Sequence, residues 1–315
     1  MTQFLLRRLF TSMIVIFGVV TLVFVTMRAA PGDPVEAILG EQALEVDKEQ
    51  MRVCLNLADE HGDPVPKWEQ YLLFWGDVLD GTFGELCDEP GVYVIDRLID
   101  NIPPTFELAL AAMLFAILIG LPLGIIAALR PYSWIDNTSA VISLMGISIP
   151  NFWLGPMLLI LFSLTLQVLP NPGAGVSGLA ALVLPAITLG TALSAKLMRM
   201  TRSSMLEVLN RDYIRTAKAK GLSAWRVTLK HGLRNALIPV VTIIGLQFGA
   251  LLTGAIIVEK IFARPGVGTM LLDGIEQRNY LIVQGCVLFI SFTYVIVNLV
   301  TDLLYGFVDP RIRYD

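Results

Sequence analysis

Histidine, cysteine and charged residues are scarce in this chain of 315 residues. It has two histidines and three cysteines, and 16% of its residues are charged whereas 55% are hydrophobic. It contains no Gly-x-x-x-x-Gly-Lys-Ser/Thr sequence, no His-Glu-x-x-His and no cluster of cysteines and histidines, so neither a P-loop nor a common metal site is expected. The mean hydropathy of +0.68 is typical of a protein that crosses a membrane several times.

One glycine-rich stretch suggests two enzyme classes, and the sequence supports neither. Residues 173–178 read Gly-Ala-Gly-Val-Ser-Gly, but no predicted strand precedes them, as a dinucleotide-binding turn requires. Ser177 within it would need a base to act as the nucleophile of a membrane protease. The histidines, His61 and His231, are predicted on opposite sides of the membrane and away from it. We therefore expect no catalytic site in this chain.

Charge is sorted along the sequence by region. Residues 31–101 hold 17 of the 27 acidic residues, and residues 196–234 hold 10 of the 23 basic ones. This pattern indicates membrane topology rather than nucleic-acid binding. Cys54 and Cys87 both lie in the acidic segment and can form a disulfide if that segment is outside the cytoplasm. Their positions in the sequence do not establish whether the two cysteines approach each other. No metal site is expected.

Six apolar stretches predict an all-α membrane protein with six transmembrane helices. Six spans place both termini on one side, together with Arg7, Arg8, Arg130, the basic residues of 196–234, Arg311 and Arg313. The positive-inside rule assigns that side to the cytoplasm. We predict three regions: an N-terminal transmembrane helix (1–30), an acidic helical insert outside the cytoplasm (31–101), and a core of five transmembrane helices (102–315) with a cytoplasmic loop at 199–237. The predicted spans are 9–26, 105–129, 137–169, 179–198, 238–258 and 281–307.

Two of these boundaries depend on proline. The Asn101-Ile102-Pro103-Pro104 sequence is expected to close the acidic insert before the second span begins. The third span is longer than one upright helix needs, and we predict that it is a single helix kinked near Pro150 and the Gly155-Pro156 pair.

A basic stretch from Arg211 to Pro239 is the part of the chain least explained by membrane crossing. It predicts two short helices around Gly221, the first capped by Asp212 and the second by Ser223. The second helix is expected to stop or turn before Pro239. Such a stretch is either a solvated loop or a docking surface for a partner outside the bilayer.

A few polar residues lie inside the predicted spans, where they are costly unless they face protein or water. They are candidates for a translocation path, although hydrogen bonding between helices explains each of them equally well. These residues are Ser143, Ser148, Asn151, Gln247, Thr253 and Asn298.

Several motifs along the chain together resemble a known family. They are Phe-Leu-Leu-Arg-Arg-Leu at the N-terminus, Pro-Gly-Asp-Pro-Val after the first span, Asp-Tyr-Ile-Arg-Thr-Ala-Lys-Ala-Lys-Gly-Leu and His-Gly-Leu-Arg-Asn-Ala-Leu-Ile-Pro in the basic stretch, and Pro-Gly-Val-Gly-Thr-Met before the sixth span. With them, nearly the whole chain resembles the membrane permease subunit of bacterial ATP-binding-cassette (ABC) importers of the dipeptide/oligopeptide type. The general importer pattern has a glutamate in the loop that is absent here, and a shorter glycine-to-proline distance.

The resemblance implies a type I importer permease fold and a multi-pass protein of the bacterial cytoplasmic membrane. It also implies a second homologous permease subunit, two cytoplasmic ATP-binding subunits, an extracytoplasmic substrate-binding protein and a peptide substrate. ATP and Mg²⁺ would be bound by the ATP-binding subunits and no cofactor by this chain. Alternatives are another cargo, such as a nickel chelate or glutathione, and an ATP-independent channel or carrier. The loop residues expected to couple to the ATPase are Asp212, Tyr213, Arg215, Thr216, Ala217, Lys218, Ala219, Lys220, Gly221, Leu222, Ser223 and Pro239. Within this loop, Ala217 and Ala219 are expected to keep the helix thin enough to enter a groove of the ATPase.

Overall fold

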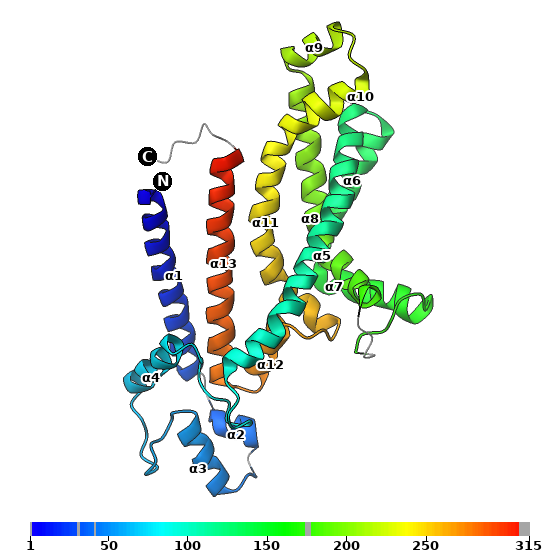
Figure 1. Cartoon of the computed structure of the whole chain (residues 1–315). Helices are drawn as coiled ribbons and strands as arrows, with labels where there is room; N and C mark the ends of the chain where they lie inside the picture. Colours follow the sequence, from blue (N-terminus) through cyan, green and yellow to red (C-terminus); the bar gives the residue numbers. More distant parts are fainter. Residues whose placement is uncertain (1, 30–31, 41, 174–177, 309–315) are drawn as a thin grey trace. The chain divides into compact units, whose positions relative to one another are not determined.

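The computed structural model describes residues 2–29, 32–40, 42–173 and 178–308, and these residues form helices and connecting turns without a β-sheet (Figure 1). Ser177 of the glycine-rich stretch lies outside the described residues. The helices are α1 (Thr2–Ala29), α2 (Pro34–Leu39), α3 (Glu45–Cys54), α4 (Lys67–Leu79), α5 (Val94–Leu129), α6 (Trp134–Ser148), α7 (Asn151–Leu158), the π-helix η1 (Leu159–Thr165), α8 (Leu179–Leu209), α9 (Asp212–Ala219), α10 (Ala224–Arg226), the π-helix η2 (Val227–Leu233), α11 (Arg234–Ile261), α12 (Val267–Glu276) and α13 (Tyr280–Val308).

Five helical segments among the described residues are long and apolar enough to cross a membrane, and a bent pair makes a sixth if it is counted as one span. The bent pair corrects the prediction for the third span. The helix ends at Ser148, and the next helical segment leaves at 104° to it. Proline disfavours helical geometry in the residue before it, which explains why α6 ends just before Pro150. Pro150 is then the N-cap residue of α7. Pro156 lies inside α7.

The chain divides into two compact units. Unit 1 comprises residues 1–105 and 265–295, and unit 2 comprises residues 106–264 and 296–315. This division differs from the three predicted regions, because the first helix, the acidic insert and part of α13 belong to one unit. The tertiary contacts thus group segments that are far apart in sequence.

In unit 1, the amphipathic helix α4 packs along α1. The Tyr71 hydroxyl and the Thr21 hydroxyl are 2.7 Å apart, and the rings of Trp75 and Phe17 stack with their centroids 5.6 Å apart. Val20 and Phe24 of α1 are buried in the same cluster, which Leu288 of α13 completes. Because these contacts extend over about two turns of α1, α4 lies beside the membrane-crossing helix and not beyond its end.

The remainder of the acidic insert is held by a disulfide and an ion pair. Cys54 and Cys87 form a disulfide, with their Cα atoms 5.8 Å apart. Arg52 donates to the Asp33 carboxylate at 2.7 Å. Burial raises the pKa of Asp33, but the hydrogen bonds from Arg52 and from the Val35 amide outweigh it, and the pKa lies below its usual value. The ion pair therefore persists to lower pH than that of an unperturbed aspartate.

Helix α5 corrects a second boundary. It begins at Val94, inside the predicted insert, and runs without a break through Pro103 and Pro104 to Leu129. Val94 and Leu98 are fully buried in the core of unit 1, and this tertiary packing outweighs the two hydrogen bonds that the prolines remove.

Removal of the disulfide is expected to lower the free energy of unfolding by about 3–4 kcal/mol, because it closes a loop with a sequence separation of 33 residues. The measurement is denaturation of the full chain in detergent, with Cys54→Ser/Cys87→Ser compared with wild type. Reductant should lower wild type to the level of the double variant and leave the variant unchanged. Equal stability of wild type with and without reductant would contradict the prediction.

Unit 2 is built on close helix packing around α8. Its core cluster includes Leu108, Leu193, Leu197, Val240 and Val258. A methyl group placed on Gly190 of α8 would lie 2.6 Å from the carbonyl oxygen of Ala112 in α5, so the two backbones approach as only small residues allow. Helices α9 and α10 lie together at one end of this unit, at the end of α8 and the start of α11 (Figure 1).

Candidate functional site

The segment between α8 and α10 forms a short helix and a tight turn, and we refer to residues 210–223 as the basic turn. Helix α8 continues beyond the predicted fourth span to Leu209, and α9 spans Asp212–Ala219. Gly221 follows with φ = +74°, the left-handed conformation that glycine adopts without steric cost. The left-handed conformation predicted for Gly221 is therefore confirmed.

A small apolar cluster fixes α9 to the following helix. Ile214 is fully buried and Ala217 is 7% exposed, and both pack against Val227 of η2, which is 1% exposed. Leu222 is half-buried at the same cluster. Residues 214 and 217 share one face of α9 because they are three apart. Since η2 continues into α11, α9 is joined by packing to a membrane-crossing helix.

The structure corrects three details that were predicted for this segment. The N-cap of α9 is Arg211, and Asp212 is the first helical residue, where its carboxylate pairs with Arg215 at 3.4 Å. Ser223 is an N-cap residue whose side chain makes no capping hydrogen bond. Pro239 lies inside α11. The helical segment runs without interruption from Ala224 to Ile261, so it does not end at this proline.

The role expected of Ala217 also changes. This residue faces the protein's own cluster, whereas Ala219 is exposed. The outer face of the basic turn is polar and cationic, and Tyr213 at its edge accepts a hydrogen bond at 3.1 Å from Asn235 of α11. Trp225 of α10, which the sequence analysis missed, is 70% exposed next to this face. The other exposed residues between 210 and 226 are Asn210, Arg211, Asp212, Arg215, Thr216, Lys218, Ala219, Lys220, Gly221, Ser223, Ala224 and Arg226.

The six polar residues predicted inside the spans have different environments. Ser148 and Thr253 are exposed on the isolated chain, and Asn151 and Asn298 are half-buried. Gln247 accepts a hydrogen bond at 2.9 Å from Lys196 of α8. Ser143 is buried and donates to the carbonyl oxygen of Ala140. Within the described residues, none of the six hydrogen-bonds to another of them, and their role as a path remains a prediction.

Sequence analysis also missed an ion pair between α6 and α8. Asp136 is buried at the start of α6, where it accepts hydrogen bonds from Arg202 of α8 and from the Tyr132 amide. The signal was present, because Asp136 is the only charged residue of α6. The pair ties the beginning of α6 to the end of α8 that leads into the basic turn.

Comparisons with known proteins identify relatives of this chain. The family of "binding-protein-dependent transport system inner membrane component" proteins matches residues 120–314. The chain is 40% identical to the dipeptide transport system permease protein DppB of Escherichia coli K12 over 100% of this chain and 99% of the relative. It is 38% identical to the oligopeptide transport system permease protein AppB of Bacillus subtilis over all of both chains. It is 40% identical to the glutathione transport system permease protein GsiC of Escherichia coli, again over all of both.

Solved structures share the fold. The MetNI methionine ABC transporter in an inward-facing conformation superposes with a TM-score of 0.54 at 19% identity, covering 68% of this chain and 97% of that chain. An amino acid ABC transporter gives 0.53 at 16% identity, covering 69% of this chain and 95% of that chain. The family match covers more than half of the residues, and the relatives match from end to end. The chain is therefore a member of the family of inner membrane components of binding-protein-dependent transport systems.

Proposed function

We propose that this chain forms one half of the translocation pathway of an ATP-driven importer for short peptides in the bacterial cytoplasmic membrane. It would work with a second homologous permease chain, two cytoplasmic ATP-binding subunits and an extracytoplasmic binding protein. Both termini and the basic turn would lie in the cytoplasm, and the disulfide-bonded insert outside it. Three relatives named for dipeptide, oligopeptide and glutathione transport support a peptide cargo.

The packing of the basic turn is the observation that carries the mechanism. An exposed cationic face on α9 offers a contact for acidic groups of an ATP-binding subunit. The buried Ile214 and Ala217 connect α9 to η2, and η2 is continuous with α11. Movement of a bound ATP-binding subunit would therefore displace α11. The packed contact between α9 and η2 would pass the movement on, because tightly packed side chains do not yield gradually. ATP hydrolysis would take place in the partner subunits.

A reconstitution experiment tests this function. The chain is placed in liposomes alone, and in parallel with the second permease, the ATP-binding subunits and the binding protein, and uptake of a labelled dipeptide is measured. We expect uptake only in the complete system, and only when ATP is present on the side of the membrane where the ATP-binding subunits lie. Uptake by the chain alone would instead identify an ATP-independent carrier. Uptake of the free amino acids in preference to the dipeptide would contradict the proposal that the cargo is a peptide.

A further inference from the structure

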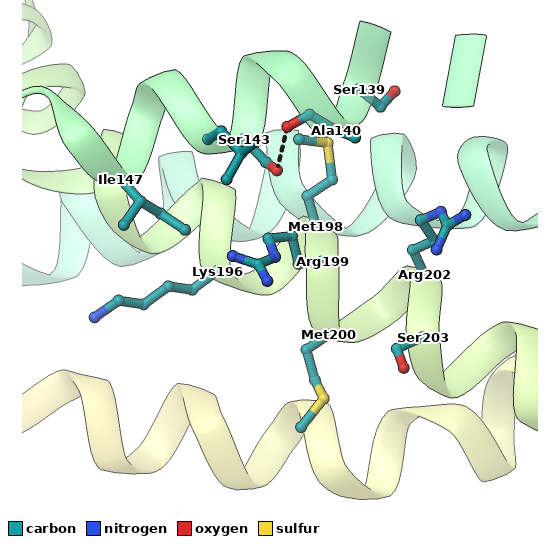
Figure 2. Close-up of a pocket in the computed structure, with 11 residues that line it drawn as sticks. Ser139, Ala140, Ser143, Ile147, Lys196, Met198, Arg199, Met200, Arg202 and Ser203 are labelled. Atoms are coloured by element: carbon teal, nitrogen blue, oxygen red, sulfur yellow. Dashed lines mark hydrogen bonds between the residues drawn. The ribbon is translucent and has the colours of Figure 1, made fainter. Parts of the chain in front are cut away.

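A cavity of about 640 Å³ lies between α6 and α8, on the side of unit 2 where the Asp136–Arg202 pair joins the two helices. Figure 2 draws the lining side chains, with Lys196, Arg199 and Arg202 on α8 and Ser139 and Ser143 on α6. The polar and charged residues that line it are Ser139, Ser143, Lys196, Arg199, Arg202 and Ser203.

The cavity has more positive than negative charge. Arg202 is neutralised by Asp136, and Lys196 donates only to the uncharged amide of Gln247. Among the described residues, no acidic side chain forms an ion pair with Lys196 or Arg199. Cations within a membrane-crossing segment are costly without a counter-charge. The cavity is therefore suited to bind an anionic group.

The depth of the cavity matches that of a lipid headgroup. Tyr132 and Trp134 at the start of α6 are 91% and 76% exposed, and exposed aromatic residues at the end of a span mark the membrane interface. Ser139 and Ser143 follow Trp134 by about 8 and about 14 Å along the helix, at 1.5 Å per residue. The part of the cavity that these two serines line thus begins just inside the interface.

The walls of the cavity are apolar on the side away from that interface. Leu144 and Ile147 line it, and the neighbouring Val141, Ile142 and Met145 are exposed on the same helix. A ligand that is anionic at one end and apolar at the other satisfies both halves of the site. A small soluble anion would leave the apolar half unused.

We propose that this cavity binds the phosphate headgroup of an anionic phospholipid. Arg199 and Lys196 supply the counter-charge, and the hydroxyl of Ser139 on α6 can donate a hydrogen bond to a phosphate oxygen. Ser143 cannot donate as well, because its single proton is directed to the carbonyl oxygen of Ala140 at 2.9 Å. The acyl chains lie along Leu144 and Ile147.

Native mass spectrometry of the full chain, titrated with phosphatidylglycerol or phosphatidylcholine, tests the proposal. We expect a clear preference for phosphatidylglycerol, reduced about fivefold by Arg199→Gln and about thirtyfold by Lys196→Gln/Arg199→Gln. Arg7→Gln is the matched control, because Arg7 is an exposed cation near the start of α1 and outside the cavity. It should leave the preference nearly unchanged. Size-exclusion profiles show whether each variant remains folded.

Three outcomes would overturn the proposal. The first is equal binding of the two lipids by wild type. The second is the same loss in Arg7→Gln as in Arg199→Gln, which would mean general surface attraction. The third is displacement of the lipid by inorganic phosphate or by a dipeptide at millimolar concentration, which would identify a solute site.

Discussion

Replacing Ile214 by aspartate is expected to reduce ATP-driven uptake by the assembled transporter at least tenfold. Ile214 is fully buried against Val227, and a carboxylate at this position would remain in water only if α9 left the cluster. The basic turn would then lose its packed connection to α11. The measurement is uptake of labelled dipeptide by the complete proteoliposomes, normalised to the amount of this chain incorporated.

Two further variants separate loss of coupling from loss of folding. Ile214→Val nearly conserves the volume of the side chain and should retain most of the uptake. Gly221→Val forces a β-branched residue into φ = +74° and should impair uptake, whereas Gly221→Asn should be tolerated because asparagine adopts this conformation more readily. A methyl group on Gly221 would meet nothing within 4 Å. The difference in uptake between Gly221→Val and Gly221→Asn therefore measures the effect of backbone conformation alone. Near-normal uptake by Ile214→Asp would contradict the proposed connection.

Replacing Gly190 by alanine is expected to destabilise the chain by about 1–3 kcal/mol and to lower the unfolding midpoint by roughly 5 °C. The added methyl group would lie 2.6 Å from the Ala112 carbonyl oxygen and 2.9 Å from Cδ1 of Phe115. Backbone cannot move aside as a flexible side chain can, so α5 and α8 must separate. The measurement is thermal unfolding of the full chain in detergent.

Gly18 provides the matched control for this substitution. It also lies in a membrane-crossing helix, α1, but a methyl group there would meet nothing within 4 Å. Gly18→Ala should therefore be neutral or slightly stabilising, because alanine favours helix more than glycine does. If both substitutions had the same effect, the close approach of α5 and α8 would not be a source of stability.

The sequence was sufficient for properties that depend on composition and local geometry. Long apolar runs predicted the helices of the core, and a glycine between two short helical stretches predicted the left-handed turn at Gly221. The resemblance carried by motifs along the whole chain identified the family, which the comparisons confirm.

What the sequence could not provide depends on tertiary contacts. Pro103 and Pro104 suggested a boundary, but burial of Val94 and Leu98 carries α5 through them. Pro150 suggested a kink, whereas the chain turns by 104°, because local preference shows where a helix ends and not where the next one points. Ala217 looked like an exposed residue of a thin helix until its partner, Val227, was located on η2.

The cluster around Phe24 also bears on the order in which this protein is made. Its members are Val20 and Phe24 from α1, Phe74 from α4 and Leu288 from α13. During synthesis α1 leaves the ribosome long before α13, so Val20 and Phe24 remain without their last partner until almost the whole chain has been inserted. A chain that stops before α13 would display this unfilled aromatic surface in the bilayer.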